Sequence, residues 1–272
     1  MRRFSVTPRE LIVSVWCHRA LLSALVRREV IGRYRGSLMG LVWSFLNPVF
    51  MLLIYTFVFS VVLKARWSVD SDSRTEFAMV LFSGLLVFNM FAECINRAPA
   101  LVLSNVNYVK KVVFPLEILP WVSMGAAIFH TVISLAVWLI AYLILFGLPH
   151  TTVLLMPLVL IPLVFMTMGF SWLLASLGVY LRDVAQFIGI VTTVLLFLSP
   201  IFYPASALPE EYRALIYVNP LTPVVELTRD VLYWGRMPDW TLFSAYLGAS
   251  MIVGWAGFAW FQRTRKGFAD VL

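Results

Sequence analysis

Few residues in this chain of 272 carry the chemistry that catalysis or ion transport requires. Glu93 and Arg97 lie one helical turn apart, and they are the only close pair of opposite charges within a long apolar stretch. Intramembrane acids often mark proton or ion pathways, but we favour an ion pair at the edge of a membrane span. His18, His130 and His150 lie in different regions, so the sequence predicts no metal site. We interpret His130 as a hydrogen-bonded packing residue rather than as a proton relay.

Nucleotide and cysteine chemistry are missing as well. The chain has no G-x-x-x-x-G-K-[ST] motif, so it has no phosphate-binding loop for ATP. Cys17 and Cys94 are too few and too far apart for a disulfide framework or a cysteine metal site. We therefore predict no enzymatic activity, no catalytic residue and no cofactor in this chain. Any energy for its function must come from a partner.

Aromatic side chains gather near one proline-rich segment. These residues are Phe202, Tyr203, Tyr212, Tyr217, Tyr233 and Trp234. Aromatic faces with few charges suit the apolar faces of sugar rings, which predicts a channel or gate for a glycan. An ordinary interfacial belt of a membrane protein has the same composition, and both interpretations remain open.

Composition identifies the kind of protein that must hold these residues. The chain is 61% hydrophobic and only 13% charged, with a mean hydropathy of +0.88. Soluble domains are nearer 45–50% apolar and about 25% charged, so a soluble enzyme and a disordered chain are both excluded. Long unbroken apolar runs also exclude a membrane β-barrel, whose strands alternate. We predict an all-α polytopic membrane protein.

The positions of the charges divide the chain into spans. Residues 118–181 contain no charged side chain, and as one helix they would be about 96 Å long. They must fold into a hairpin of two spans, with the turn near Gly147 and Pro149. The same approach predicts six transmembrane helices, at about 37–63, 77–95, 118–146, 153–181, 187–203 and 242–261.

Basic residues orient these spans. Fifteen of the 21 Lys and Arg residues lie on the side that carries both chain ends, and six lie on the other side. Because cytoplasmic loops are enriched in Lys and Arg, both termini are predicted to be cytoplasmic. The formal charge of +7 therefore reflects orientation, and we expect contacts with membrane lipids and none with nucleic acid.

Two regions do not span the membrane in this prediction. Residues 7–28 favour an amphipathic helix on the inner membrane surface, with a solvated basic helix as the alternative. Residues 204–239 contain short helical candidates between prolines, which are too short to cross a membrane. Broken helices at membrane depth need cover from protein or from a water-filled cavity. We expect short re-entrant gate helices before the last span, rather than a plain loop.

Six stretches, in order, resemble the membrane subunits of type-2 ABC exporters (the ABC-2 family). They are RREVIGRYRGSLMGLVWSFLNP (27–48), NVNYVKKVVFPLEILP (105–120), LRDVAQ (181–186), SPIFYP (199–204), NPLTPVVELTRDVLYWGRMPDW (219–240) and FADVL (268–272). The resemblance covers nearly the whole chain, and it is greatest to the branch that exports lipid-linked polysaccharides such as O-antigen, capsule and teichoic acid.

This resemblance implies a single transmembrane domain over 1–272 that forms half of a transporter. Two copies would pair in a bacterial inner membrane, with two cytoplasmic ATPase subunits that bind ATP and Mg²⁺. Segment 104–114 matches the coupling helix of the family, and 204–239 matches its periplasmic gate. The residues implied to face the ATPase are Ser104, Asn105, Tyr108, Lys110, Lys111 and Phe114.

The resemblance also implies the substrate, an undecaprenyl-linked polysaccharide, with O-antigen first and capsule or teichoic acid as alternatives. Spans one and five would line a continuous channel. Arg33 and Arg35, at its inner mouth, would receive the lipid pyrophosphate; anchoring by positive charge alone is an equal alternative. Two rival hypotheses are export of a small drug or lipid, and a membrane-embedded acyltransferase. The scattered histidines and charge-free hairpin disfavour the enzyme.

Overall fold

A computed structural model of the chain describes residues 6–62, 67, 74–110, 114–204, 211, 216 and 219–272. Every regular element within those residues is a helix, and they contain no strand. The all-helical prediction is therefore confirmed. The helices, in chain order, are α1 (Pro8–Cys17), α2 (Arg19–Tyr34), α3 (Trp43–Tyr55), α4 (Arg74–Arg97), α5 (Val106–Lys110), α6 (Leu119–Phe146), α7 (Met156–Tyr180), α8 (Val184–Leu198), α10 (Thr222–Arg229), α11 (Trp240–Thr264) and α12 (Phe268–Val271).

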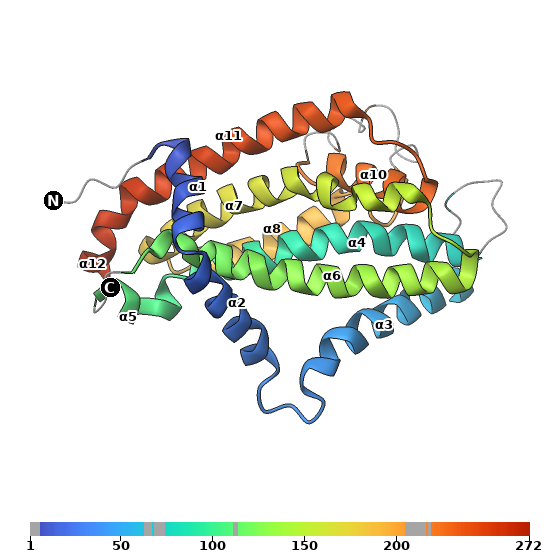
Figure 1. Cartoon of the computed structure of the whole chain (residues 1–272), viewed down its shortest axis with the longest axis horizontal. Helices are drawn as coiled ribbons and strands as arrows, with labels where there is room; N and C mark the ends of the chain where they lie inside the picture. Colours follow the sequence, from blue (N-terminus) through green and yellow to red (C-terminus); the bar gives the residue numbers. More distant parts are fainter. Residues whose placement is uncertain are drawn as a thin grey trace.

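The long helices run side by side in one bundle (Figure 1). Helices α1, α5 and α12 gather at one end of it, and α10 lies toward the other. We call these the α5 end and the α10 end. Helices α2 and α3 diverge from the bundle and meet at a sharp connection, so that they form a V below it (Figure 1).

Five stretches among the described residues are long and apolar enough to cross a membrane. They are Gly40–Phe59, Thr75–Ala100, Leu116–Phe146, Thr151–Tyr180 and Trp240–Val271. The span expected at 187–203 corresponds to α8, which has 15 residues and is about 22 Å long, shorter than a ~30 Å hydrocarbon core. The prediction of six spans is therefore not confirmed: the described residues hold five candidate spans and one shorter apolar helix.

Proline explains why α8 stops short. Ser199 adopts an extended conformation with φ −77° and ψ 144°, because the ring of Pro200 disfavours helical geometry in the residue before it. The Ser199 hydroxyl donates to the Leu195 carbonyl at 2.6 Å and accepts from the Asn219 amide at 2.9 Å. The helix end is thus tied to the chain that leads into α10.

Helix α4 forms the centre of the bundle. Its most apolar window is 89% buried within the protein, whereas that of the span containing α3 is 17% buried. Helices α3, α6, α7, α8 and α10 all pack around α4. Helix α4 is therefore surrounded by protein, whereas α3 leaves most of its apolar surface to lipid or to another chain.

Glycines bring three helical segments into backbone contact. A Cβ atom on Gly257 of α11 would lie 2.0 Å from the carbonyl oxygen of Gly169 on α7, and one on Gly178 would lie 2.1 Å from that of Pro99. Only glycine permits such approaches, which are typical of helix packing within membranes. Helices α7 and α11 therefore pack with their backbones in contact.

The N-terminal segment differs from the single helix expected over 7–28. It consists of α1 and α2, and the break is at His18 (φ −102°, ψ 16°), whose Nδ1 atom lies 2.8 Å from the Ser14 carbonyl oxygen. A side chain bound to the preceding turn competes with the helical backbone pattern. The second helix also continues to Tyr34, past the expected end, so the segment enters the bundle instead of stopping at its edge.

The proline-rich region at 204–239 is described only in part. Two stretches between its prolines, 209–218 and 223–232, are the predicted short helices, and the first falls almost entirely on residues outside the described ones. The second corresponds to α10, which continues as a π-helix over Asp230–Trp234. Gly235 ends it with φ 64°, a left-handed conformation that suits glycine. Helix α10 packs against α4 and α7.

Candidate functional site

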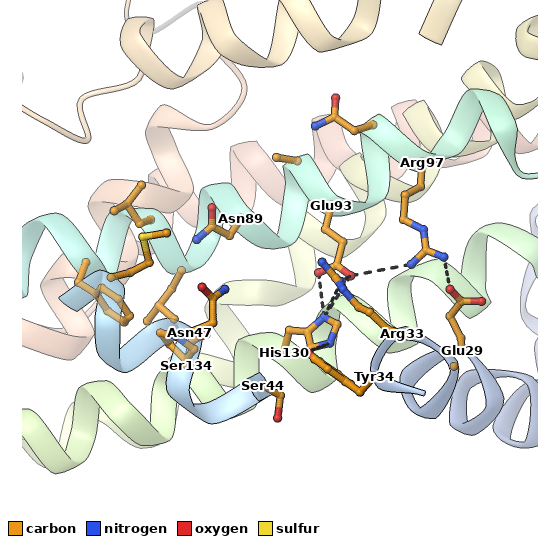
Figure 2. Close-up of a pocket in the computed structure, with 18 of the residues that line it drawn as sticks. Glu29, Arg33, Tyr34, Ser44, Asn47, Asn89, Glu93, Arg97, His130 and Ser134 are labelled. Carbon is orange, nitrogen blue, oxygen red and sulfur yellow. Dashed lines mark hydrogen bonds and ion pairs between the residues drawn. The ribbon is translucent and has the colours of Figure 1, made fainter. Parts of the chain in front are cut away.

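A cavity of about 860 Å³, with charged and amide side chains in its wall, lies between α2, α3, α4 and α6 (Figure 2). Along α4 its lining changes in character. Arg97 and Glu93 carry charge near the α5 end, Asn89 lies one turn further, and Leu85 and Phe82 follow toward the α10 end. One cavity therefore combines ionic, amide and apolar surfaces within a membrane-spanning bundle.

Glu93 is the centre of the ionic part. Its Oε1 atom lies 2.5 Å from Nη1 of Arg33 on α2, and its Oε2 atom lies 2.9 Å from Nδ1 of His130 on α6. Arg97 is 4.0 Å from Glu93 and is ion-paired with Glu29 of α2. Figure 2 shows these side chains converging from three helices. Two carboxylates balance two guanidinium groups, which makes this cluster tolerable in apolar surroundings.

The hydrogen bonds assign the tautomer of His130. The Glu93 carboxylate can only accept, so Nδ1 of His130 carries the proton and donates to it. Nε2 then accepts from the Tyr34 hydroxyl at 3.2 Å. Burial raises the pKa of Tyr34, a shift that Arg33 opposes and Glu93 supports, so this hydroxyl keeps its proton. The interpretation of His130 as hydrogen-bonded packing agrees with this geometry.

Sequence reasoning found the pair Glu93–Arg97 but missed Arg33 and His130 as closer partners of Glu93. A signal was present in the sequence, because Glu29-x-x-x-Arg33 repeats the spacing of Glu93-x-x-x-Arg97. The two motifs pair head to tail, with Arg33 on Glu93 and Arg97 on Glu29.

Arg33 and Arg35, which were predicted together, occupy different environments. Arg33 lines the cavity, and its side chain is half-exposed there. Arg35 follows the last residue of α2, is exposed and does not line the cavity. Only Arg33 is therefore in position to meet a ligand inside the cavity.

The predicted coupling segment lies at the α5 end. Ser104 and Asn105 belong to a 3₁₀ turn, Tyr108 and Lys110 to α5, and the structure describes Phe114 again beyond it. Lys111 lies outside the described residues. Within the described part of the expected coupling helix 104–114, the α-helix α5 has five residues.

Contacts tie this segment to distant parts of the chain. Tyr108 stacks on Phe114 with ring centroids 4.3 Å apart, and its hydroxyl accepts from Arg28 of α2 at 3.2 Å. Lys110 donates to the Leu272 carbonyl beyond α12. Segment 104–114 is therefore linked by a hydrogen bond to α2, one of the walls of the cavity.

A second ionic cluster holds the neighbouring backbone in place. Arg265 pairs with Glu117 at 2.5 Å and donates to the Phe114 carbonyl at 2.7 Å. Ser14 of α1 donates to the other carboxylate oxygen of Glu117 at 3.1 Å. The side chains of Arg265 and Glu117 are both little exposed. This cluster joins α1 to the turn before α6 and to the turn after α11, at the α5 end.

The predicted gate aromatics fall into two groups. Phe202 stacks between Phe59 and Phe197, at 6.0 and 5.7 Å, and the neighbouring Tyr203 hydroxyl donates to the Phe197 carbonyl. Tyr233 and Trp234 instead contact each other, and Tyr233 also contacts Tyr142 and Phe146 at the end of α6. Tyr212 and Tyr217 lie outside the described residues. The structure thus does not bring the described four together.

Arg229 of α10 is another charge that the sequence did not single out. Its side chain is buried, donates to the carbonyl oxygens of Ile201 at 2.9 Å and Val80 at 3.4 Å, and lies 4.3 Å from the centroid of the Trp67 ring. It does not reach the cavity. Burial raises the pKa of its neighbour Glu226, although Arg229 itself opposes that shift.

The part of the chain that the structure describes contains no group of three or more His, Cys, Asp or Glu residues placed to hold a metal. What the cavity offers is hydrogen bonding and ion pairing. Such chemistry suits the binding of an anionic or hydroxyl-rich molecule.

Comparisons with known proteins agree with this description. An O-antigen export system permease protein of Myxococcus xanthus is 28% identical over 262 residues, which cover 96% of this chain and 98% of the relative. One from Klebsiella pneumoniae is 25% identical, with 93% and 95% covered, and a polysialic acid transport protein of Escherichia coli is 24% identical, with 86% and 92% covered. Residues 20–233 match the family model described as ABC-2 type transporter, so this chain belongs to that family.

Proposed function

We propose that this protein is the membrane subunit of an ATP-driven exporter that moves lipid-linked O-antigen polysaccharide across a bacterial inner membrane. The observation that carries the proposal is similarity over nearly the full length to O-antigen export permeases of two organisms. The polar side chains in the cavity of an otherwise apolar bundle support it, because a hydroxyl-rich substrate needs polar partners at membrane depth.

In this proposal the working unit is a homodimer with two cytoplasmic ATPase subunits, which bind ATP and Mg²⁺. The excess of Lys and Arg beside both termini supports a cytoplasmic location for the α5 end. Closure of the ATPase pair would press on segment 104–114 as a rigid body. Tyr108 would pass the displacement to α2 through Arg28.

The lipid pyrophosphate would be received by Arg33, with Arg35 guiding it from outside the cavity. Arginine suits this role because its planar guanidinium makes paired hydrogen bonds to phosphate oxygens. In the structure Arg33 already pairs with Glu93, whose Oε1 atom lies 2.5 Å from Nη1 of Arg33. An incoming pyrophosphate would therefore replace one carboxylate at Arg33, which leaves Glu93 to His130 and Arg97.

Deletion of the gene, followed by electrophoresis and immunoblotting of surface polysaccharide, tests the substrate. We expect surface O-antigen to disappear and lipid-linked glycan to accumulate inside, with both effects reversed by the wild-type gene. A strain with unchanged surface glycan would reject polysaccharide export and favour a small drug or lipid instead.

Capsule export is the second candidate, favoured by the polysialic acid transport proteins among the relatives. The two candidates differ in the glycan that accumulates after deletion. An intracellular capsular or teichoic acid polymer, with O-antigen still on the surface, would decide for the second.

Coupling is tested by Lys110→Gln with Lys111→Gln. We expect export to fall about tenfold, as loss of roughly 1.4 kcal/mol at an interface would produce, while the protein stays in the membrane at its usual amount. The readouts are surface glycan and ATP hydrolysis by the complex in lipid nanodiscs. Lys266→Gln, an exposed charge at the same end, serves as the control. Normal surface glycan in the double variant would contradict the coupling role.

A further inference from the structure

Three asparagines of membrane-spanning segments line the cavity. Asn47 belongs to α3, and Asn89 and Asn96 belong to α4; all three side chains are exposed. Because Asn89 and Asn96 are seven residues apart, they lie on one face of α4, about 10 Å apart along its axis. Figure 2 shows Asn47 and Asn89 on neighbouring helices, facing the same space.

The amides have hydrogen-bonding capacity that the protein leaves largely unused. Each can donate two hydrogen bonds and accept two. Among the described residues, only Thr192 bonds one of them, by donating to Asn96 at 3.0 Å. An amide without a hydrogen-bond partner is costly in hydrocarbon, so we expect these side chains to meet water or a ligand in the cavity.

The chemistry of the lining selects the class of ligand. We propose that Asn47, Asn89 and Asn96 form an amide stripe that binds the hydroxyl groups of the exported glycan, an inference that rests on the proposed function. Neutral amides carry no charge for an anion and no carboxylate for a metal, but they both donate to and accept from hydroxyls. Ser44 and Ser134 line the same cavity with further small polar groups.

The amide stripe and the ionic cluster lie next to each other along α4. Glu93, between Asn89 and Asn96 on α4, holds Arg33 at the level of the stripe. A molecule whose pyrophosphate is bound by Arg33 therefore has its first sugars beside amides. Beyond Asn89 the lining becomes apolar, with Leu85 and Phe82.

Leucine substitutions separate this role from the alternatives. Leucine has nearly the shape of asparagine without its hydrogen bonds, so the variant is Asn47→Leu, Asn89→Leu and Asn96→Leu together. The complex with its ATPase, in lipid nanodiscs, is tested for binding of two probes. One is the cell's own polysaccharide released from its lipid by mild acid, and the other is undecaprenyl pyrophosphate.

We expect the triple variant to bind the polysaccharide at least about tenfold more weakly, as loss of several neutral hydrogen bonds implies, and to bind undecaprenyl pyrophosphate as the wild type does. Asparagine-to-glutamine variants at the same positions should recover most of the binding. Ser244→Ala removes an exposed hydroxyl on α11, outside the cavity, and should change neither probe.

Three results would overturn the stripe. Unchanged polysaccharide binding with higher thermal stability would mean that the asparagines face lipid. Loss of the dimer, measured by mass photometry, would make them a contact between two copies. Equal loss of both probes would place them in the headgroup site. A wild-type complex that binds neither probe, together with unchanged surface glycan after gene deletion, would instead count against the proposed function itself.

Discussion

Arg33 and Arg229 are both arginines within an apolar bundle, but the protein satisfies them differently. The Arg33 side chain is 50% exposed to the cavity and pairs with the carboxylate of Glu93. Arg229 is 5% exposed and donates to two main-chain carbonyls, while its guanidinium lies over the ring of Trp67.

The partners determine what each arginine can do. A main-chain carbonyl within a folded segment cannot leave its position, so Arg229 joins α10 to α4 and to the chain after α8 permanently. A carboxylate side chain can rotate, and Glu93 has His130 as a second partner at 2.9 Å. Arg33 is therefore held by an exchangeable contact. Arg229 is thus held by main-chain carbonyls, whereas Arg33 is held by a side chain that faces the cavity.

The largest effect is expected for Arg229→Leu. It would leave the carbonyls of Val80 and Ile201 buried without their donor, which costs about 2–4 kcal/mol of unfolding free energy. Thermal unfolding of the complex in detergent measures this loss. The stability of Arg229→Lys should fall between those of the wild type and Arg229→Leu, because an ammonium cannot contact both carbonyls and the ring.

Arg182→Leu, at an exposed position between α7 and α8, is the matched control and should change stability by less than about 0.5 kcal/mol. If Arg229→Leu unfolded at the same temperature as this control, the fixed role assigned to Arg229 would have to be abandoned.

The exchangeable contact is tested by Glu93→Gln and Arg33→Gln, alone and together. We expect a coupling free energy of only about 1 kcal/mol, because the pair is partly solvated, and it should shrink at high salt. Glu93→Gln frees Arg33, so undecaprenyl pyrophosphate should bind about three- to tenfold more tightly. Arg33→Gln should weaken the same binding.

A double-mutant cycle on thermal stability and a binding titration provide these numbers. Tighter pyrophosphate binding in Glu93→Gln is the decisive sign. Weaker binding in that variant would mean that Glu93 positions Arg33 for its ligand instead of competing with the ligand.

Local signals in the sequence predict much of the fold. The helices follow the apolar runs, and Gly147 and Pro149 mark the turn between α6 and α7. Pro200 also indicates the early end of α8, although the apolar run beyond it favoured a longer helix. The bend at His18 has no comparable signal, since it depends on a hydrogen bond to Ser14.

The site was harder to predict because its partners are distant in the sequence. Glu93 and Arg97 are recognisable from their spacing, but the contact of Arg33 with Glu93 joins residues 60 positions apart. Two Glu-x-x-x-Arg motifs suggest such a pairing without specifying it. The burial of Arg229 likewise follows from how α10 packs on α4, which composition does not reveal.

The smallest effect is expected for Tyr34→Phe. This change removes only the hydroxyl that donates to Nε2 of His130 at 3.2 Å. Water in the cavity can replace a donor at that position, so the loss of unfolding free energy should stay below about 1 kcal/mol.

Tyr55→Phe is the matched control, since Tyr55 lines the same cavity and its hydroxyl has no hydrogen bond to another described residue. Thermal unfolding and undecaprenyl pyrophosphate binding are measured for both variants. A loss in Tyr34→Phe as large as that in Arg229→Leu would show that the hydroxyl locks His130 and Glu93 in place, and the cavity charges would then be as fixed as those at the α10 end.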